Sequence, residues 1–179
     1  MTTPHDRAVL HQILNPLMPT TEQDIEEKDL EKDNIQHEGY EESVKLELEG
    51  MKLAESKNLD DAILKFTEAH EKCPVSPSPL NNRAQAYRLK DRVEEALTDL
   101  NECLKLTNPR SKTACQAYVQ RASIYRLKGD DDRARDDFQK ASELGSSFAK
   151  MQLVTLNPYA AMCNKMLAEV FDKVKNNKE

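Results

Sequence analysis

The chain has 179 residues, which is enough for one ordinary domain and too few for two. Its 32% of charged residues, four glycines and lack of tryptophan favour helices and argue against a loop-rich β fold or a phosphate-cradling enzyme. The net charge is −6, yet ten acidic residues and two lysines between Glu22 and Glu42 carry −8, so the remainder carries +2. That remainder lacks the concentrated basic face of a nucleic-acid-binding protein.

The N-terminal region differs from the rest of the chain. It has no basic start before an apolar core, so we expect no signal peptide, and nowhere does the chain approach the roughly 20 apolar residues of a membrane span. Residues 19–42 are predicted to form an acidic, partly mobile linker. We expect residues 1–42 to dock on the folded part or on a partner. Residues 1–18 are predicted to form a short amphipathic helix with an apolar stripe of Val9, Leu10, Ile13 and Leu14.

One pattern of large and small residues occurs three times along the chain. The letters YRLK begin at Tyr87 and again at Tyr125, 38 residues later. Small residues recur in the same register at Ala62, Ala96 and Ala134, and the first of these intervals is 34 residues. That period is typical of a helix–turn–helix repeat, in which small residues let two helices cross closely.

The periodicity predicts an all-α fold, a right-handed α-solenoid of three helix–turn–helix units with a C-terminal capping segment. The units span 43–76, 77–110 and 115–148, and the capping helices span 149–179. Helical spacing predicts that Met162, Met166, Leu167 and Val170 of the cap are buried.

Short polar and glycine signals mark the expected helix ends. Asp60 or Asp61, and Asp130, are expected to cap the second helices of the first and third units. Gly145 is expected to end the last helix of the third unit, and a serine to start the next helix.

The three units resemble tetratricopeptide repeats (TPRs) when position 1 is set at Ser43, Pro77 and Cys115. A TPR pattern asks for a small residue at position 8, a tyrosine at position 11 and an alanine at position 20, and several of these columns agree. Position 7 should be leucine and departs in all three units, so we expect looser helix packing there: it is Glu49, Arg83 and Arg121.

The arrangement as a whole resembles the tetratricopeptide repeat protein 36 family over almost its full length. The resemblance is carried by DRAVLHQILNP, NNRAQAYRLK, GDDDRARDDFQKAS and LNPYAAMCNKML. It implies a small cytosolic, co-chaperone-like interaction protein that associates with the 70-kDa heat-shock chaperone and is linked to tyrosine breakdown.

Many chaperone-binding TPR proteins hold the terminal carboxylate of an acidic tail with Lys, Asn and Arg side chains, in a carboxylate clamp. Each lost charge-assisted hydrogen bond costs about 1.5–3 kcal/mol. We therefore expect clamp binding to be weak and a chaperone to bind elsewhere, because only Asn82 matches among the residues at the five clamp positions: Glu47, Met51, Asn82, Gln116 and Gln120.

The first helices of the three units are predicted to line a partner-binding groove that is apolar at one end and rich in amides at the other. Amides suit an extended peptide backbone, and arginines suit a carboxylate or phosphate. For any single residue the alternative is an ordinary solvated helix surface. The predicted groove residues are Leu48, Met51, Asn81, Asn82, Gln85, Arg88, Gln116, Gln120 and Arg126.

We expect no catalytic site, cofactor or metal. The chain has no Gly-rich phosphate loop, HExxH, CxxC or nucleophile elbow. The spacings of its four cysteines fit neither a zinc site nor a disulfide framework, so a reduced, cytoplasmic protein is favoured. Two non-enzymatic functions stay open: a chaperone-linked adaptor, and a structural subunit or assembly factor of a larger complex, for example a ciliary one.

Overall fold

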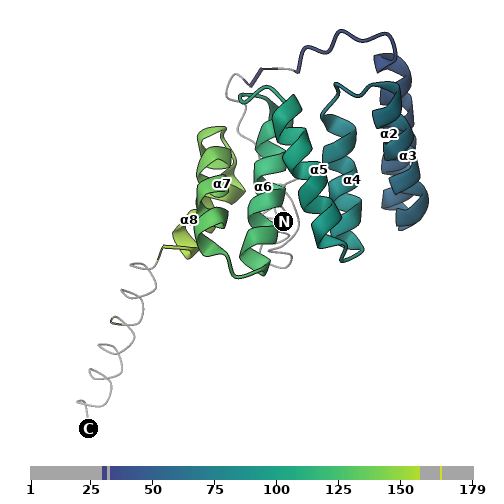
Figure 1. Ribbon diagram of the computed structural model, residues 1–179. Coiled ribbons are helices and arrows are strands. Elements are labelled where there is room, and N and C mark those ends of the chain that lie inside the picture. The colour runs from purple at the N-terminus through teal and green to yellow at the C-terminus, as the bar shows by residue number, and fades with distance from the viewer. Residues whose placement is uncertain (1–29, 32, 158–165, 167–179) are drawn as a thin grey trace, which may run out of the picture.

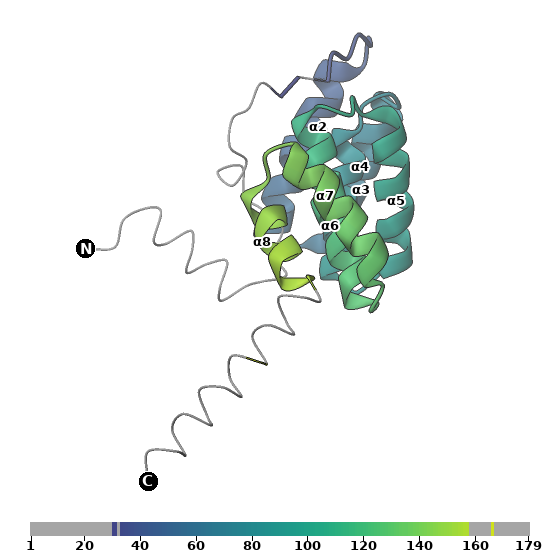
Figure 2. The same ribbon diagram turned by 90° about the vertical axis from the view of Figure 1, so that its left-hand side faces the viewer.

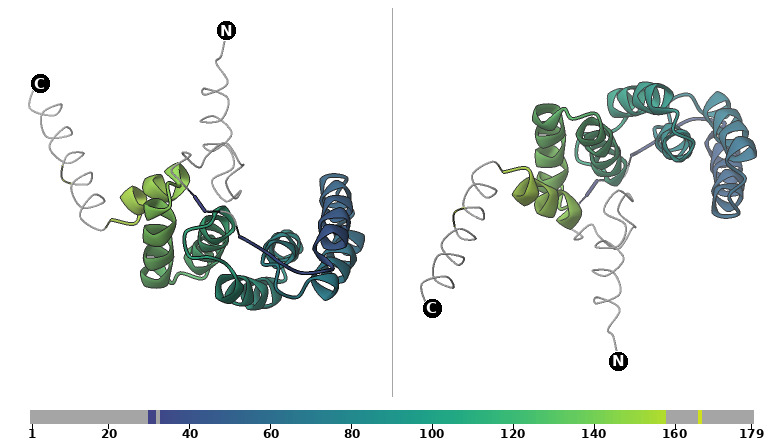
Figure 3. Two further views of the ribbon diagram at one scale, coloured as in Figure 1. Left: turned by 90° about the horizontal axis from the view of Figure 1, so that it is seen from above. Right: turned by 90° about the horizontal axis from the view of Figure 1, so that it is seen from below.

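The computed structural model describes residues 30, 31, 33–157 and 166. In this part of the chain seven helices stack side by side into an arc, which confirms the predicted all-α solenoid (Figures 1 and 3). The helices are α2 (Tyr40–Glu55), α3 (Leu59–Lys72), α4 (Ser78–Leu89), α5 (Val93–Leu106), α6 (Lys112–Leu127), α7 (Asp131–Glu143) and α8 (Ser147–Thr155).

Successive helices pack as hairpins, α2 with α3, α4 with α5 and α6 with α7. Small residues lie where the paired helices cross, and Ala62, Ala96 and Ala134 are fully buried. At Gly50 an added Cβ would lie 2.7 Å from Cε1 of Phe66, so this crossing has no room for a side chain unless the ring shifts. The division into units 43–76, 77–110 and 115–148 stays our prediction.

The turn inside each hairpin has the same backbone geometry. Lys57, Asp91 and Gly129 have φ values of 66°, 59° and 76°, in the left-handed region. Only one of the three is glycine, although this conformation costs other residues about 1–2 kcal/mol. We infer that the packing of the paired helices holds Lys57 and Asp91 in this left-handed conformation. Because neither residue is glycine, the sequence does not predict the conformation of the first two turns.

The structure confirms one predicted helix cap and contradicts another. Asp130 is the N-cap of α7, and its Oδ1 accepts a hydrogen bond from the Arg133 backbone N–H at 3.1 Å, which confirms that prediction. The prediction for α3 was wrong, because Asn58 is the N-cap and Asp60 and Asp61 lie in the first turn. Carboxylates in a first turn still interact favourably with the helix dipole.

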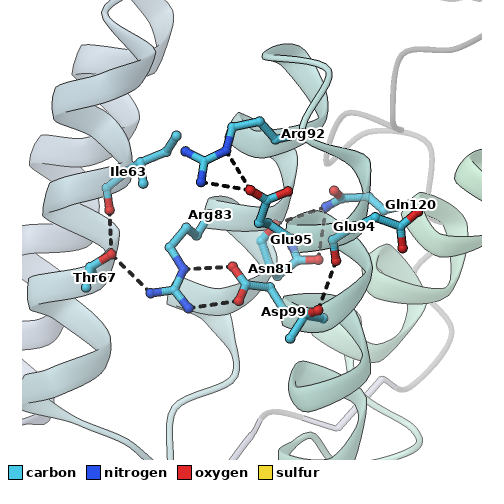
Figure 4. A network of polar contacts seen from close by, with 10 residues as sticks. Ile63, Thr67, Asn81, Arg83, Arg92, Glu94, Glu95, Asp99 and Gln120 are labelled. Atoms are coloured by element: carbon cyan, nitrogen blue, oxygen red, sulfur yellow. Dashed lines mark hydrogen bonds and ion pairs between the residues drawn. The ribbon is translucent and has the colours of Figure 1, made fainter.

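Position 7 of the second unit holds one half of a buried ion pair (Figure 4). Arg83 donates to Asp99 twice, from Nε to Oδ2 at 2.7 Å and from Nη2 to Oδ1 at 2.8 Å. Its Nη1 also donates to Thr67 Oγ1 on α3 at 3.0 Å. One guanidinium thus joins the two helices of its own hairpin and the outer helix of the preceding one.

The third hairpin repeats this arrangement in the same register. Arg121 donates to Asp137 from Nε at 2.7 Å and from Nη2 at 2.8 Å, and its Nη1 donates to Asn101 Oδ1 at 2.7 Å. In the first hairpin the charges are reversed, and Lys65 Nζ lies 3.8 Å from Glu49 Oε2. The expectation of loose packing at position 7 is therefore corrected, because a cross-helix ion pair occupies this column in all three hairpins.

The lysines of the two YRLK copies also repeat one contact. Lys90, directly after α4, pairs with Asp60 at the start of α3, and Lys128 Nζ, directly after α6, lies 2.6 Å from Glu94 Oε1 at the start of α5. Each lysine therefore reaches the outer helix of the preceding hairpin. These pairs are exposed, so each stabilises the stack by no more than about 1 kcal/mol.

The end of the acidic linker lies along the edge of the arc where the loops between hairpins are found (Figure 1). The backbone N–H of Glu31 donates to the Arg110 carbonyl at 3.1 Å. Asp33 Oδ1 accepts hydrogen bonds from Thr107 Oγ1 at 3.0 Å and from the Asn108 N–H at 2.9 Å. This stretch therefore contacts the α5–α6 loop, and the part of the docking hypothesis that concerns residues 1–29 lies outside the described residues.

We expect Asp33→Ala to lower the free energy of unfolding by about 1–2 kcal/mol. The substitution removes two charge-assisted hydrogen bonds, and their half-exposed position reduces the usual value. Urea unfolding followed by circular dichroism measures the change. Asp33→Asn is the matched control, since it keeps an acceptor oxygen and should lose less; an equal loss for both variants would mean that charge alone matters.

Helix α8 closes the far end of the stack (Figure 2). As predicted, Gly145 ends the preceding segment with a φ of 98°, and Ser146 Oγ accepts from the Ala149 N–H at 3.1 Å. Phe148 packs edge-on against Phe138 of α7, with ring centroids 6.1 Å apart.

The expectation that Met166 is buried was wrong, because its side chain is 59% exposed. The other three apolar positions of that prediction lie outside the described residues; they are Met162, Leu167 and Val170. The predicted helix 1–18 and Cys163 also lie outside them.

Candidate functional site

Helices α2, α4 and α6 line the inner side of the arc, and α3, α5 and α7 lie on the outer side (Figure 3). We call the exposed side of the three inner helices the inner face. On α3, α5 and α7 the exposed large apolar residues are Leu64 and Leu106. The inner helices expose more of them, with exposed fractions of 50%, 41%, 49% and 57% for Leu48, Met51, Leu89 and Leu127.

Glu47 of α2 is the polar centre of the first half of the inner face. Its Oε1 accepts hydrogen bonds from Asn82 Nδ2 at 2.7 Å and from Ser78 Oγ, both on α4. Burial raises the pKa of Glu47 above its ordinary value, and the two hydrogen bonds oppose that rise. The sequence pattern identified Glu47 only as a lost clamp residue and missed these contacts, although Ser78 and Asn82 are four residues apart and so share one face of α4.

The hydrogen bond to Glu47 also occupies the amide of Asn82, which the sequence pattern identified as a clamp residue. It is the one residue that matches the carboxylate clamp, but its amide donates to Glu47. A carboxylate at this place would repel the terminal carboxylate of an acidic tail. Weak clamp binding stays a prediction, and the contact between these two side chains gives its physical reason.

Two of the predicted groove residues are corrected by the structure. Asn81 and Gln120 are 4% and 2% exposed, and Gln120 Nε2 donates to Asn81 Oδ1 at 3.0 Å and to the Asn81 carbonyl at 3.3 Å (Figure 4). These amides therefore join α4 to α6 and are not available to a partner. Periodicity placed them on the correct side of each helix, but the neighbouring inner helix covers them.

The remaining predicted residues of α4 and α6 are partly exposed. Gln116 accepts a long hydrogen bond of 3.4 Å from Asn81 Nδ2, while Gln85 and Arg88 are half-buried. Burial lowers the pKa of Arg88. Arg126 donates to Gln152 Oε1 and so connects α6 with α8. Their role in partner binding stays a prediction.

The described residues contain no group of three or more His, Cys, Asp or Glu side chains that could hold a metal ion. Cys73, Cys103 and Cys115 are buried free thiols. Burial raises the pKa of Cys103 to about 12 and that of Cys115 to about 11, which opposes nucleophilic reactivity. In the same part of the chain no helix is long and apolar enough to cross a membrane.

Hairpins of this kind, stacked with small residues at each crossing, define a tetratricopeptide repeat protein. The family model described as Tetratricopeptide repeat matches residues 77–109 and 116–144, which correspond to the second and third hairpins. Curated relatives give the particular family. The chain is 68% identical over 179 residues to Tetratricopeptide repeat protein 36 of Caenorhabditis elegans, with 100% of both chains covered.

The human Tetratricopeptide repeat protein 36 is 41% identical over 187 aligned positions, which cover 100% of this chain and 99% of the human one. The chain therefore belongs to the tetratricopeptide repeat protein 36 family. Its fold is similar to the first TPR of Spaghetti (RPAP3) bound to HSP90 peptide SRMEEVD, with a TM-score of 0.60 and 22% identity over 68% of this chain and 95% of that one.

Proposed function

We propose that this protein is a non-enzymatic adaptor whose inner face binds a protein or peptide partner. The observation that carries the proposal is the exposure of large apolar side chains on the inner helices, which also carry the partly exposed Glu47, Arg88 and Arg126. Exposed apolar side chains rimmed by polar groups are typical of a protein interaction site. The stack supports such a face because buried amides join α4 to α6, and Arg83, which is paired with Asp99 inside its own hairpin, also donates to Thr67 of the preceding hairpin.

The partner that the family resemblance favours is the 70-kDa heat-shock chaperone or one of its clients, in the cytoplasm. The similarly folded RPAP3 domain, bound to an HSP90 peptide, supports a chaperone-linked role. The clamp positions do not support the same binding mode, since Glu47 engages Asn82. Protection of an enzyme of tyrosine breakdown would follow if that enzyme were the client.

We expect the variant with both Leu48→Ser and Met51→Ser to recover at least about tenfold less partner than the native chain. A tenfold loss corresponds to about 1.4 kcal/mol, a modest value for two apolar contacts removed from an interface. Quantitative mass spectrometry of proteins captured on the immobilised chain measures the loss. The same data distinguish a chaperone with its client from a fixed multi-subunit complex.

Leu64→Ser is the matched control, because Leu64 is 60% exposed on the outer helix α3. It should leave both recovery and melting temperature unchanged. Equal recovery by the native chain and the Leu48/Met51 double variant would overturn the inner face as the binding surface.

A further inference from the structure

Glu47 is a half-buried carboxylate that has no ion-pair partner within the described part of the chain. The ion pairs within 4.0 Å among the described residues involve other acidic groups, such as Glu42, Asp99 and Asp137, and none of them includes Glu47. Its neighbours on α4, Ser78 and Asn82, are neutral donors. Withdrawing a carboxylate from water without a compensating charge is unfavourable, so this site favours a ligand that supplies a positive charge.

The hydrogen bonds leave part of the carboxylate open to such a ligand. Both donors reach the same oxygen, Oε1, and the described residues form no hydrogen bond with Oε2. Glu47 as a whole is partly exposed, so its carboxylate is not sealed from solvent. An incoming ammonium or guanidinium group could therefore bind Oε2 without displacing Ser78 or Asn82.

Two exposed apolar side chains lie close to this acceptor in sequence on the same helix. Leu48 follows Glu47 directly, and Met51 lies one helical turn further on, with exposed fractions of 50% and 41%. The methylene stems of lysine and arginine cover apolar surface while their charged ends reach a polar group. The chemistry next to Glu47 thus fits one long cationic side chain with an apolar neighbour.

We propose that the α2–α4 part of the inner face is a subsite for a lysine or arginine side chain of an internal partner segment, with Glu47 as its acceptor. This inference rests on the proposed function and states which chemistry the inner face selects. It predicts that the chain prefers basic–apolar segments within a partner to acidic C-terminal tails. The charge of Glu47, opposite to that of a terminal-carboxylate site, is the physical reason.

The test uses the full-length chain and two positional-scanning libraries of short peptides, one with blocked ends and one with free C-terminal carboxylates. In the blocked library we expect lysine or arginine to exceed neutral residues about tenfold at one position. Glu47→Gln keeps an oxygen that accepts from Ser78 and Asn82, and it should abolish the preference. Glu47→Lys should shift it toward aspartate and glutamate.

Glu71→Gln removes an exposed carboxylate from outer helix α3 and is the matched control, which should select the same peptides as the native chain. Peptide selection without a basic preference, or with one that survives Glu47→Gln, would overturn the cation subsite and leave the adaptor function intact. If the native chain selects no peptide from either library, while Leu48→Ser with Met51→Ser also leaves partner capture unchanged, the adaptor function fails together with the subsite.

Discussion

Replacing Asp99 with alanine should lower the free energy of unfolding by about 3 kcal/mol. The carboxylate is only 7% exposed and the Arg83 side chain 15%, so the substitution leaves a nearly buried guanidinium without its partner. Removal of one member of a buried ion pair typically costs about 3–5 kcal/mol. For a chain of this size the melting temperature should fall by about 10 °C, and differential scanning calorimetry measures it.

Two further variants separate the buried charge from the lost contact. Arg83→Met combined with Asp99→Leu removes both charges, so it should be more stable than Asp99→Ala alone. Glu49→Ala breaks the reversed pair of the first hairpin, in which Glu49 is 60% and Lys65 31% exposed, and it should cost less than about 1 kcal/mol. Equal losses at Glu49 and Asp99 would contradict the role of burial.

Phe138→Ala should destabilise the protein by about 3–5 kcal/mol and release α8 from the stack. The side chain is 1% exposed, and its ring meets Phe148 edge-on in the buried cluster that joins α6, α7 and α8. Loss of the ring leaves a cavity and removes the edge-on contact between α7 and α8. Hydrogen exchange of the α8 amides, measured together with urea unfolding, reports both effects.

The chain itself supplies the control for this prediction. The residue at the same position of the second hairpin is Leu100, which is fully buried. Phe138→Leu should therefore cost only about 1–2 kcal/mol and leave the α8 amides protected. Loss of α8 protection in the leucine variant, or its retention in the alanine variant, would show that the aromatic contact does not hold the cap.

Sequence periodicity was sufficient to predict which residues pack inside each hairpin. The alanines at 62, 96 and 134 recur in one register, and all are fully buried. Helix geometry relates side chains three or four residues apart, so a pattern read along the chain identifies the faces that pack within a hairpin. The same reasoning located Asp130 as a helix cap, because capping is a local contact.

Sequence periodicity did not predict the ion pairs between helices. Arg83 and Arg121 looked like departures from the TPR pattern, because their partners Asp99 and Asp137 lie 16 residues further on, across the hairpin. A charged residue at an apolar position is informative only when the opposite charge facing it is known. The distance between the two columns depends on how the helices cross, which no single helix pattern contains.

The amino-acid sequence by itself determined the all-α repeat architecture, the family and the set of helices that line the inner face. Only the tertiary structure decided which of those residues stay available to a partner. Asn81 and Gln120 are buried against each other, whereas Glu47 stays partly exposed and both of its hydrogen bonds from the described residues end on one oxygen. The reason is physical: helical spacing selects a face, but the stacking of the next hairpin covers part of that face and leaves the rest exposed.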